Sequence, residues 1–256
     1  MGFWLRFEQA GKTGFGRLEG ETIQVHEGDL FDAPRPTGAS LALGDVTLLT
    51  PCQPSKILAL WNNSRSLAAK QNLAEPAEPL FFFKAPNGYL ASGGAIPAPA
   101  SYDGAVFYEA ELGVVIGKAC RDITEAEAAA HIFGYTCVND VTAVELINKV
   151  PAFPQWSRAK SFDGFCPFGP VIATDLDVDD LTIRAELNGR ARQNYSTSDY
   201  FFRPAALVSL LSRGMTLSPG DIVSCGTGPG ALPMKPGSTI DIVIDGIGRL
   251  TNRFGG

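Results

Sequence analysis

The first thirty residues alternate apolar and polar positions, with glycines between the apolar stretches. Residues 3–8, 14–20 and 22–25 each read as a short strand, and together they predict a small antiparallel meander. The following stretch, Asp32–Gly38, contains two prolines and reads as a linker, which places a boundary near residue 50. We therefore expect a small N-terminal β domain over residues 1–50 and a larger domain over residues 51–256.

Beyond Lys56 the pattern mixes short strands with a few helices. Thr124–Glu127 is a capping box and opens an alanine-rich helix that runs toward His131. A second short helix is expected over residues 141–149. A third is expected to begin at Pro204, where proline fits the first turn, and to end at Gly214.

The last third of the chain consists of strand-like runs separated by glycine and proline, such as Asp221–Cys225 and Thr239–Ile244. Strands dominate the whole chain, and strands and helices do not alternate regularly. This pattern predicts an α+β protein that is mostly β, and it argues against a doubly wound parallel sheet.

Composition narrows the classes of function. The chain has 256 residues and a net charge of −6, which argues against a nucleic-acid or anionic-membrane surface. The five cysteines are odd in number and scattered, so we expect reduced thiols in a cytoplasmic protein. The N-terminus lacks a basic leader, and the apolar runs are too short to span a membrane.

The strongest chemical signal is a pair of glutamates followed by an aspartate. Glu109 and Glu111 are two residues apart in a strand-like segment, so both side chains leave the same face. Asp140 ends another strand-like run about thirty residues later. Three converging carboxylates repel one another unless a hard divalent cation lies between them, so these residues predict a metal site.

Other common chemistries find little support. His26 lies in the meander and His131 ends a helix, so both are interpreted as structural. There is no G-x-S-x-G motif for a hydrolase serine. The glycine-rich loop Gly226–Gly230 lacks a following helix because Pro229 and Pro233 forbid one. This loop either brings backbone N–H groups close to a small anion or forms a tight turn.

A series of ordered motifs resembles the fumarylacetoacetate hydrolase superfamily, from about Lys56 to the end of the chain. These motifs are, in order, Pro79–Pro86, Tyr108–Gly117, Gly134–Ala143, Lys160–Asp163, Gly169–Pro170, Leu187–Gly189, Pro219–Asp221 and Gly226–Gly228. One such motif alone is weak, but the series in this order is highly specific.

The resemblance implies a distorted β-roll core that carries one Mg²⁺ or Mn²⁺ ion, with Glu109, Glu111 and Asp140 as ligands. Members of the superfamily act on 2-oxo and 1,3-dioxo acids by C–C hydrolysis, decarboxylation or isomerisation. All three reactions form an enolate that a metal can stabilise. The resemblance also implies a homodimer and a small-molecule acid as the partner.

The same resemblance suggests roles for further residues. Lys160 matches a lysine that faces the metal and is the candidate catalytic residue, either as a cation for the substrate or as a proton carrier. Thr227 and Gly226 match an anion-holding loop. Lys84 either lines the pocket or merely extends from a strand end. Arg158 is a candidate substitute contact for the substrate.

Two departures from the superfamily pattern bear on the reaction. Many members carry a His and a Glu in a short lid helix, where they activate water; here Leu67 and Lys70 occupy those positions. Val144 and Ile147 stand where members often place an Arg and a Gln toward the substrate. The absence of this base argues most strongly against the hypothesis of a hydrolase, because hydrolysis needs a group that positions water.

Three hypotheses remain open at this stage. The first is an isomerase, tautomerase or decarboxylase of a dicarboxylic 2-oxo acid, similar to 2-hydroxyhepta-2,4-diene-1,7-dioate isomerase. The second is a C–C hydrolase of acylpyruvate or fumarylacetoacetate-type substrates. The third is a member that binds metal and ligand without turnover.

Overall fold

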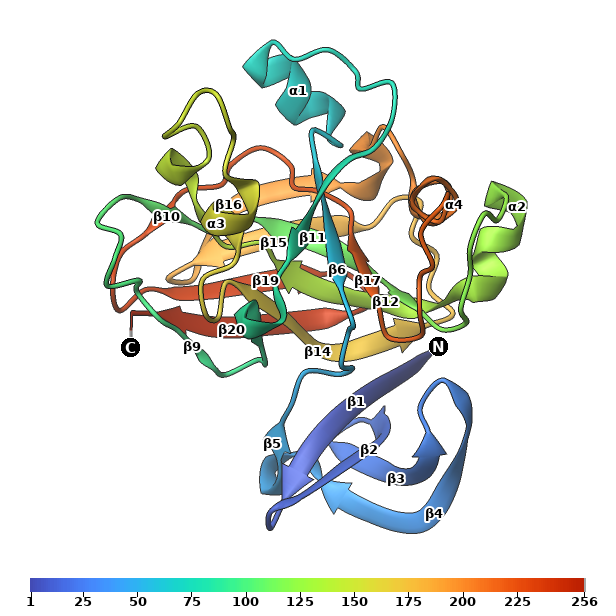
Figure 1. The fold of residues 1–256 in the computed structure, drawn as a ribbon. Coiled ribbons are helices and arrows are strands. Elements are labelled where there is room, and N and C mark those ends of the chain that lie inside the picture. The colour runs from blue at the N-terminus through green and yellow to red at the C-terminus, as the bar shows by residue number, and fades with distance from the viewer. Residues whose placement is uncertain (256) are drawn as a thin grey trace.

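The computed structural model describes residues 1–255, and its N-terminal part is the expected antiparallel meander (Figure 1). Its strands are β1 (Gly2–Gln9), β2 (Lys12–Glu19), β3 (Thr22–Asp29), β4 (Asp32–Ala42) and β5 (Thr47–Leu48). The predicted linker at Asp32–Gly38 is wrong, because these residues pair with β3 as part of β4. β4 is the outermost strand of the sheet, where Pro34 and Pro36 need no N–H on the unpaired side.

The meander continues directly into the main sheet of the molecule. The path runs β4-β3-β2-β1-β14-β12-β11-β17-β6-β7, and the pairs are antiparallel except for β17 with β6. The added strands are β6 (Ile57–Trp61), β7 (Leu80–Lys84), β8 (Tyr89–Leu90), β11 (Ala110–Ile116), β12 (Ile132–Asn139), β14 (Cys166–Thr174) and β17 (Ile222–Ser224). Figure 1 shows the blue meander below the rest of the chain, with β1 next to β14.

Two smaller sheets complete the β structure. One has the order β16 (Arg190–Ser196), β15 (Thr182–Leu187), β19 (Thr239–Ile244), β20 (Gly248–Phe254) and β9 (Ala95–Ile96). The other has the order β13 (Thr142–Ala143), β10 (Val106–Phe107) and β18 (Pro233–Met234). The fold is therefore mostly β with few helices, as the sequence predicts.

Strand β11 lies at the centre of the core and is buried along its whole length. Leu112 and Val114 belong to the large core cluster that also contains Ile183 and Ile242 of the five-stranded sheet. Val115 belongs to a second cluster on the opposite side. Burial on both faces explains why this strand is a nearly continuous apolar run rather than an alternating one.

The helices are short and lie at the margins of the sheets. They are α1 (Arg65–Gln71), α2 (Glu125–Ala128), α3 (Trp156–Lys160) and α4 (Pro204–Leu211), with single 3₁₀ turns at Leu43–Asp45, Pro86–Gly88, Ala129–His131, Val144–Leu146 and Thr197–Asp199. The Thr124 capping box is present, and α4 begins at Pro204 but ends before Gly214. In residues 1–255 no helix has the length and apolarity needed to cross a membrane.

The helix expected over residues 141–149 is wrong. Thr142 and Ala143 instead form β13, which pairs with β10, and only Val144–Leu146 makes a 3₁₀ turn. Val141 and Thr142 are β-branched, which favours extended backbone. Thr142 also pairs with Phe107 of β10, and this tertiary contact outweighs the helical pattern that the sequence suggested. The result holds Asp140 at the junction of two strands rather than at the start of a helix.

Candidate metal centre

Backbone pairing brings the three predicted ligands together. β11 and β12 are antiparallel with Ala110 opposite Asn139, so Glu109 and Asp140 lie at adjacent strand ends. The Asp140 N–H donates to the Glu109 carbonyl at 2.9 Å, and the Glu109 N–H donates to Asn139 Oδ1 at 3.1 Å. One carboxylate oxygen from each of Glu109, Glu111 and Asp140 lies within 4.8 Å of the others.

Glu111 is the more deeply buried of the two glutamates, and only one of its carboxylate oxygens accepts hydrogen bonds. Its Oε2 accepts from Ser224 Oγ at 2.5 Å and from the Gly226 N–H at 3.1 Å. Gly226 has φ +89°, a left-handed conformation that suits glycine and aims its N–H at this oxygen. Burial, then the nearby Asp140 and Glu109 carboxylates, raise the pKa of Glu111 well above its usual value.

Asp140 lies between two buried lysines. Lys84 Nζ contacts its Oδ1 at 2.6 Å, and Lys160 Nζ contacts its Oδ2 at 2.5 Å. Burial acts to raise the pKa of Asp140, but Lys160 and Lys84 together hold it below its usual value. The sequence places no cation beside these carboxylates, whereas the fold supplies two.

Lys160 also contacts Glu109 Oε2 at 2.6 Å and therefore joins two of the three carboxylates. Although burial alone lowers the pKa of Lys160, the neighbouring Asp140 and Glu109 carboxylates reverse this and raise it above the usual value. Burial raises the pKa of Glu109, with Asp140 adding to the effect and Lys160 opposing it. The ammonium also lies 4.8 Å from the centre of the Phe82 ring.

The donor set fits a hard divalent cation. Glu111 Oε1 is buried and has no hydrogen-bond partner among residues 1–255, an arrangement that costs free energy unless another group meets this oxygen. A cation held by one oxygen each of Glu109, Glu111 and Asp140 would supply that partner. All-oxygen ligation suits Mg²⁺ or Mn²⁺ and would leave about half of an octahedral shell for substrate and water.

A cavity of about 160 Å³ opens onto the carboxylates of Glu109 and Glu111, and Asp140 lies outside its lining. We call it the carboxylate cavity. Its floor consists of Glu109, Glu111, Thr142, Lys160 and Thr227. Its walls are largely apolar side chains from β6, α1, β7, the Val144 turn and α3. Charged and hydrogen-bonding groups thus gather at one end of an otherwise apolar space, the common design of a small-molecule site.

The structure places the predicted substrate contacts in different surroundings. Thr227 lines the cavity, where its Oγ1 donates to the Ala110 carbonyl at 3.1 Å. The Gly226 N–H is already used by Glu111. Lys84 is buried against Asp140 and does not line the cavity, and Arg158 is exposed on α3 and does not line it either. Their roles toward a substrate stay predictions.

The positions that depart from the superfamily pattern cluster at the cavity mouth. Leu67, Val144 and Ile147 all line the cavity, whereas Lys70 is exposed on α1 and does not. Neither of the two histidines of the chain reaches the cavity: His26 is in β3 and His131 in the turn after α2.

Several contributing residues were not foreseen from the sequence. Trp156 lines the cavity from α3, four residues before Lys160, and this helical spacing is a signal that could have identified it. Ser224 reaches Glu111 only because β17 pairs with β11, with Ser224 opposite Gly113. That contact joins distant parts of the chain, so no local sequence pattern predicts it.

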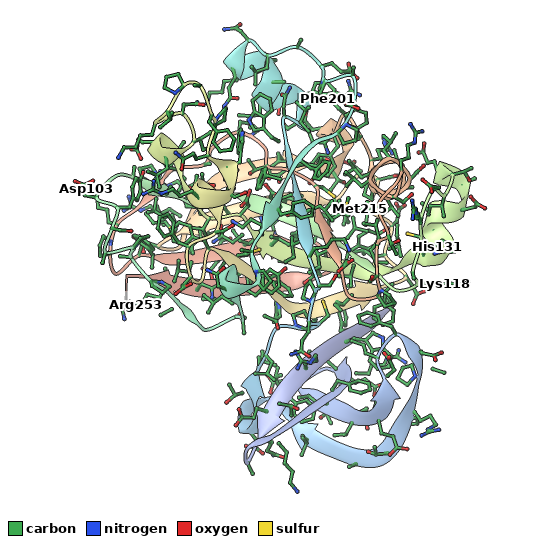
Figure 2. The ribbon with its side chains drawn as sticks, viewed as in Figure 1. Asp103, Lys118, His131, Phe201, Met215 and Arg253 are labelled. Atoms are coloured by element: carbon green, nitrogen blue, oxygen red, sulfur yellow. The ribbon has the colours of Figure 1, made fainter. Side chains whose placement is uncertain are left out.

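The short helix α1 at the cavity mouth is tied down at its first turn. Ser64 caps it by accepting from the Leu67 N–H, and Asp199 accepts from Ser64 Oγ at 2.5 Å and Ser66 Oγ at 2.7 Å. The Arg65 guanidinium lies 4.6 Å from the centre of the Phe201 ring, which Figure 2 labels near α1. Asp199 therefore anchors the start of α1 and does not contact its other end.

Asn63, just before α1, holds the same region to the core. Its Nδ2 donates to the Cys225 carbonyl at 2.7 Å and to the Phe202 carbonyl at 3.1 Å. Its Oδ1 accepts from the Phe202 N–H at 2.8 Å. One buried amide thus connects the α1 segment with the loop that follows β17.

Comparison with known proteins places this architecture in a family. The family described as "Fumarylacetoacetate (FAA) hydrolase C-terminal" matches residues 56–255, and one described as "Rv2993c-like, N-terminal" matches residues 4–51. Protein Rv2993c of Mycobacterium tuberculosis is 40% identical over 87% of this chain and 83% of its own length. Oxaloacetate tautomerase YisK of Bacillus subtilis is 34% identical over 93% of this chain and 84% of its own length.

A solved structure supports the same conclusion across the whole fold. The 2-hydroxyhepta-2,4-diene-1,7-dioate isomerase from Mycobacterium marinum is 36% identical, with a TM-score of 0.90 over 99% of this chain and 98% of its own. The chain belongs to the fumarylacetoacetate hydrolase family.

Proposed function

We propose that this protein is an Mg²⁺- or Mn²⁺-dependent enzyme that isomerises or decarboxylates a 2-oxo acid through its enolate. The observation that carries the proposal is the cluster of Glu109, Glu111 and Asp140, in which one buried oxygen of Glu111 has no hydrogen-bond partner among residues 1–255. Lys160 contacts two of these carboxylates and lines the same cavity. The activities for which the oxaloacetate tautomerase and the dienedioate isomerase are named belong to the same class.

Glu109, Glu111 and Asp140 would hold the metal. When bound, it would supply Lewis-acid chemistry that stabilises the negative charge of an enolate.

Lys160 supplies the second positive charge of the site. Its Nζ has three N–H donors, which lie next to the carboxylates of Glu109 and Asp140. Its position on the cavity floor lets one donor meet a substrate oxygen on which charge develops. Phe82 beside the ammonium limits the water that competes for it.

The surrounding residues orient this machinery rather than react. Ser224 and Gly226 fix one oxygen of Glu111 and leave the other free toward the cluster. Lys84 fixes Asp140 from outside the cavity. The apolar walls exclude water, which strengthens the electrostatic interactions at the floor.

The lining of the cavity favours isomerisation or decarboxylation over hydrolysis. Apart from the carboxylates assigned to the metal, the described lining offers no histidine or acidic side chain to activate water. Leu67 lies where a water-activating group would be useful. A hydrolase of acylpyruvates is therefore the second outcome of the test below.

The test is a metal-dependent assay with the purified protein. Enolic 2-oxo acids, acylpyruvates and hydroxymuconate-type dienes are supplied with Mg²⁺ or Mn²⁺, and the enol absorbance and the products are followed. We expect metal-dependent loss of enol without a new carboxylic acid from C–C hydrolysis. Two acids formed from an acylpyruvate would favour the hydrolase, and no turnover with metal bound would favour a non-catalytic member.

Glu111→Gln is the matching variant, with Glu125→Gln in α2 as a control. Glu111→Gln should lose metal binding in a calorimetric titration together with activity, because the orphaned oxygen becomes part of an amide. Glu125→Gln should retain both. Full activity in the presence of EDTA would overturn the proposal.

A further inference from the structure

A larger, mostly apolar groove of about 670 Å³ lies beside the carboxylate cavity. The two spaces share the side chains of Trp61, Gln71, Phe82, Val144, Ile147 and Trp156. We call this space the aromatic groove. Because these six side chains line both, the two spaces adjoin, and only side chains of this set stand between the carboxylates and the groove.

Three of the four aromatic rings that line the aromatic groove pack against one another. The Phe82 and Trp156 rings stack with centroids 5.4 Å apart and an interplanar angle of 14°. The Trp61 ring lies 5.8 Å from Trp156. Trp61 remains 38% exposed and Val144 39% exposed, although both are large apolar side chains. An aromatic wall left open to water in this way is typical of a site that receives an apolar group.

The size of the cavity assigns different parts of a substrate to the two spaces. About 160 Å³ corresponds to the volume of roughly five waters and suits a 2-oxo acid head. A substituent that exceeds this volume, such as an aromatic ring on the third carbon, would then extend into the aromatic groove. The groove is thus where the distal part of the substrate is recognised.

The charges around the groove decide which substituents are accepted. Beyond the shared residues, its lining consists of Leu80, Phe81, Asn148 and Pro154. Within residues 1–255, no Lys, Arg or His side chain lines the groove, and its polar groups are the neutral amides of Gln71 and Asn148. A second carboxylate there would lose hydration without gaining a cation, which is costly, whereas an aromatic or branched alkyl group would bury apolar surface.

We infer that the natural substrate is a 2-oxo acid with an aromatic or branched apolar distal group, not a dicarboxylate. This inference rests on the proposed function and specifies the substrate class of the same site. It differs from the dicarboxylic substrate that the sequence suggested, and the test below decides between the two. Trp61, Trp156, Phe82 and Ile147 are its specificity-determining residues.

A matched pair of substrates tests the inference. Phenylpyruvate and oxaloacetate have the same 2-oxo acid head and differ in the phenyl or carboxylate group on the third carbon. We expect kcat/KM for conversion of the phenylpyruvate enol to exceed that for oxaloacetate by on the order of tenfold or more. An equal or higher value for oxaloacetate would overturn the inference while leaving the proposed function standing.

A binding measurement decides the inference even if neither acid is converted. Phenyllactate and malate are unreactive analogues of the same pair, and calorimetry with Mg²⁺ present gives the Kd of each. Tighter binding of phenyllactate supports the inference, and tighter or equal binding of malate overturns it. Absence of turnover with both substrates would count against the proposed function alone.

Substitutions locate the preference in the groove. Val144→Arg adds a guanidinium at a partly exposed position and should shift the phenyllactate-to-malate ratio toward malate by on the order of tenfold. Trp156→Ala should reduce the same ratio. Phe153→Ser, at a 71% exposed residue outside the groove, should leave the ratio unchanged.

A second copy of the chain is the competing occupant of the groove. In that case the ratio would not respond to Val144→Arg, and sedimentation would show that this variant dissociates an oligomer. That combination would overturn the inference.

Discussion

The floor and the mouth of the site are built in contrasting ways. The floor consists of buried or half-buried groups, mostly on or beside strands and with Lys160 from the end of α3, and each carboxylate is held by ammonium groups or by hydrogen bonds. The mouth consists of α1, the Val144 turn and α3, with partly exposed apolar side chains. The contrast suggests that the floor sets the reaction and the mouth selects the substrate, so changes in the two regions should have different consequences.

The largest expected effect is on the stability of the floor. Asp140→Ala removes the acceptor of both Lys84 and Lys160 and leaves two buried ammonium groups poorly compensated. We expect a loss of about 3–5 kcal/mol in the free energy of unfolding, measured by urea denaturation. Asp103→Ala, at an exposed residue that Figure 2 places at the edge of the molecule, serves as the control. A loss below about 1 kcal/mol in the free energy of unfolding would show that the contacts of Asp140 contribute little to stability.

The next effect is on the reaction itself. Lys160→Gln removes the ammonium of the floor while keeping a hydrogen-bond donor of similar length. We expect kcat to fall by about 10²–10³-fold, as for loss of one group that stabilises a developing oxyanion. Lys118→Gln, exposed and labelled in Figure 2, is the matched control. A change confined to KM would assign Lys160 to substrate binding instead.

A smaller effect is expected at the mouth. Asp199→Ala removes the acceptor of Ser64 and Ser66 and weakens the anchoring of α1. We expect a loss of about 1 kcal/mol in stability and faster amide exchange in residues 65–71. Asp45→Ala, at an exposed residue of the N-terminal part, should leave that exchange unchanged. Unaltered exchange in Asp199→Ala would mean that α1 is held by other contacts.

The smallest effect lies outside both regions, in the cap of α2. Hydrogen bonds from the Thr124 backbone and side chain lower the pKa of Glu127. Because the folded-state pKa is depressed, the cap contributes stability above the unfolded-state pKa and loses it as pH falls through the folded value. The protection factor of the amides at the start of α2, which corrects exchange for its intrinsic pH dependence, should therefore fall on acidification, and Glu127→Gln should make it less dependent on pH. An equal pH response in that variant would contradict the assignment.

Local patterns were sufficient for much of the fold. Alternation identified the meander, the capping box identified α2, and Pro204 marked the start of α4. Each of these signals depends on neighbours within a few residues. The spacing of Glu109 and Glu111 belongs to the same kind, and the structure brings these residues together with Asp140.

Contacts between distant segments could not be predicted in this way. Lys84 meets Asp140 across 56 positions of the chain, and Ser224 meets Glu111 across 113. The mistaken linker at Asp32–Gly38 has the same origin, because edge position in a sheet is a property of the whole fold. The same holds for Thr142, whose pairing with Phe107 decides its conformation.

The pairing of β1 with β14 has a consequence for how the chain can be shortened. Trp4 lies opposite Ile172, and Phe3 opposite Ala173, so the meander covers what would otherwise be an open strand edge. A chain that began at residue 51 would present the apolar run of β14 to any other unpaired strand. By covering this edge, the N-terminal part should reduce aggregation through β14. The strand on the other side of β14 is β12, which leads into Asp140.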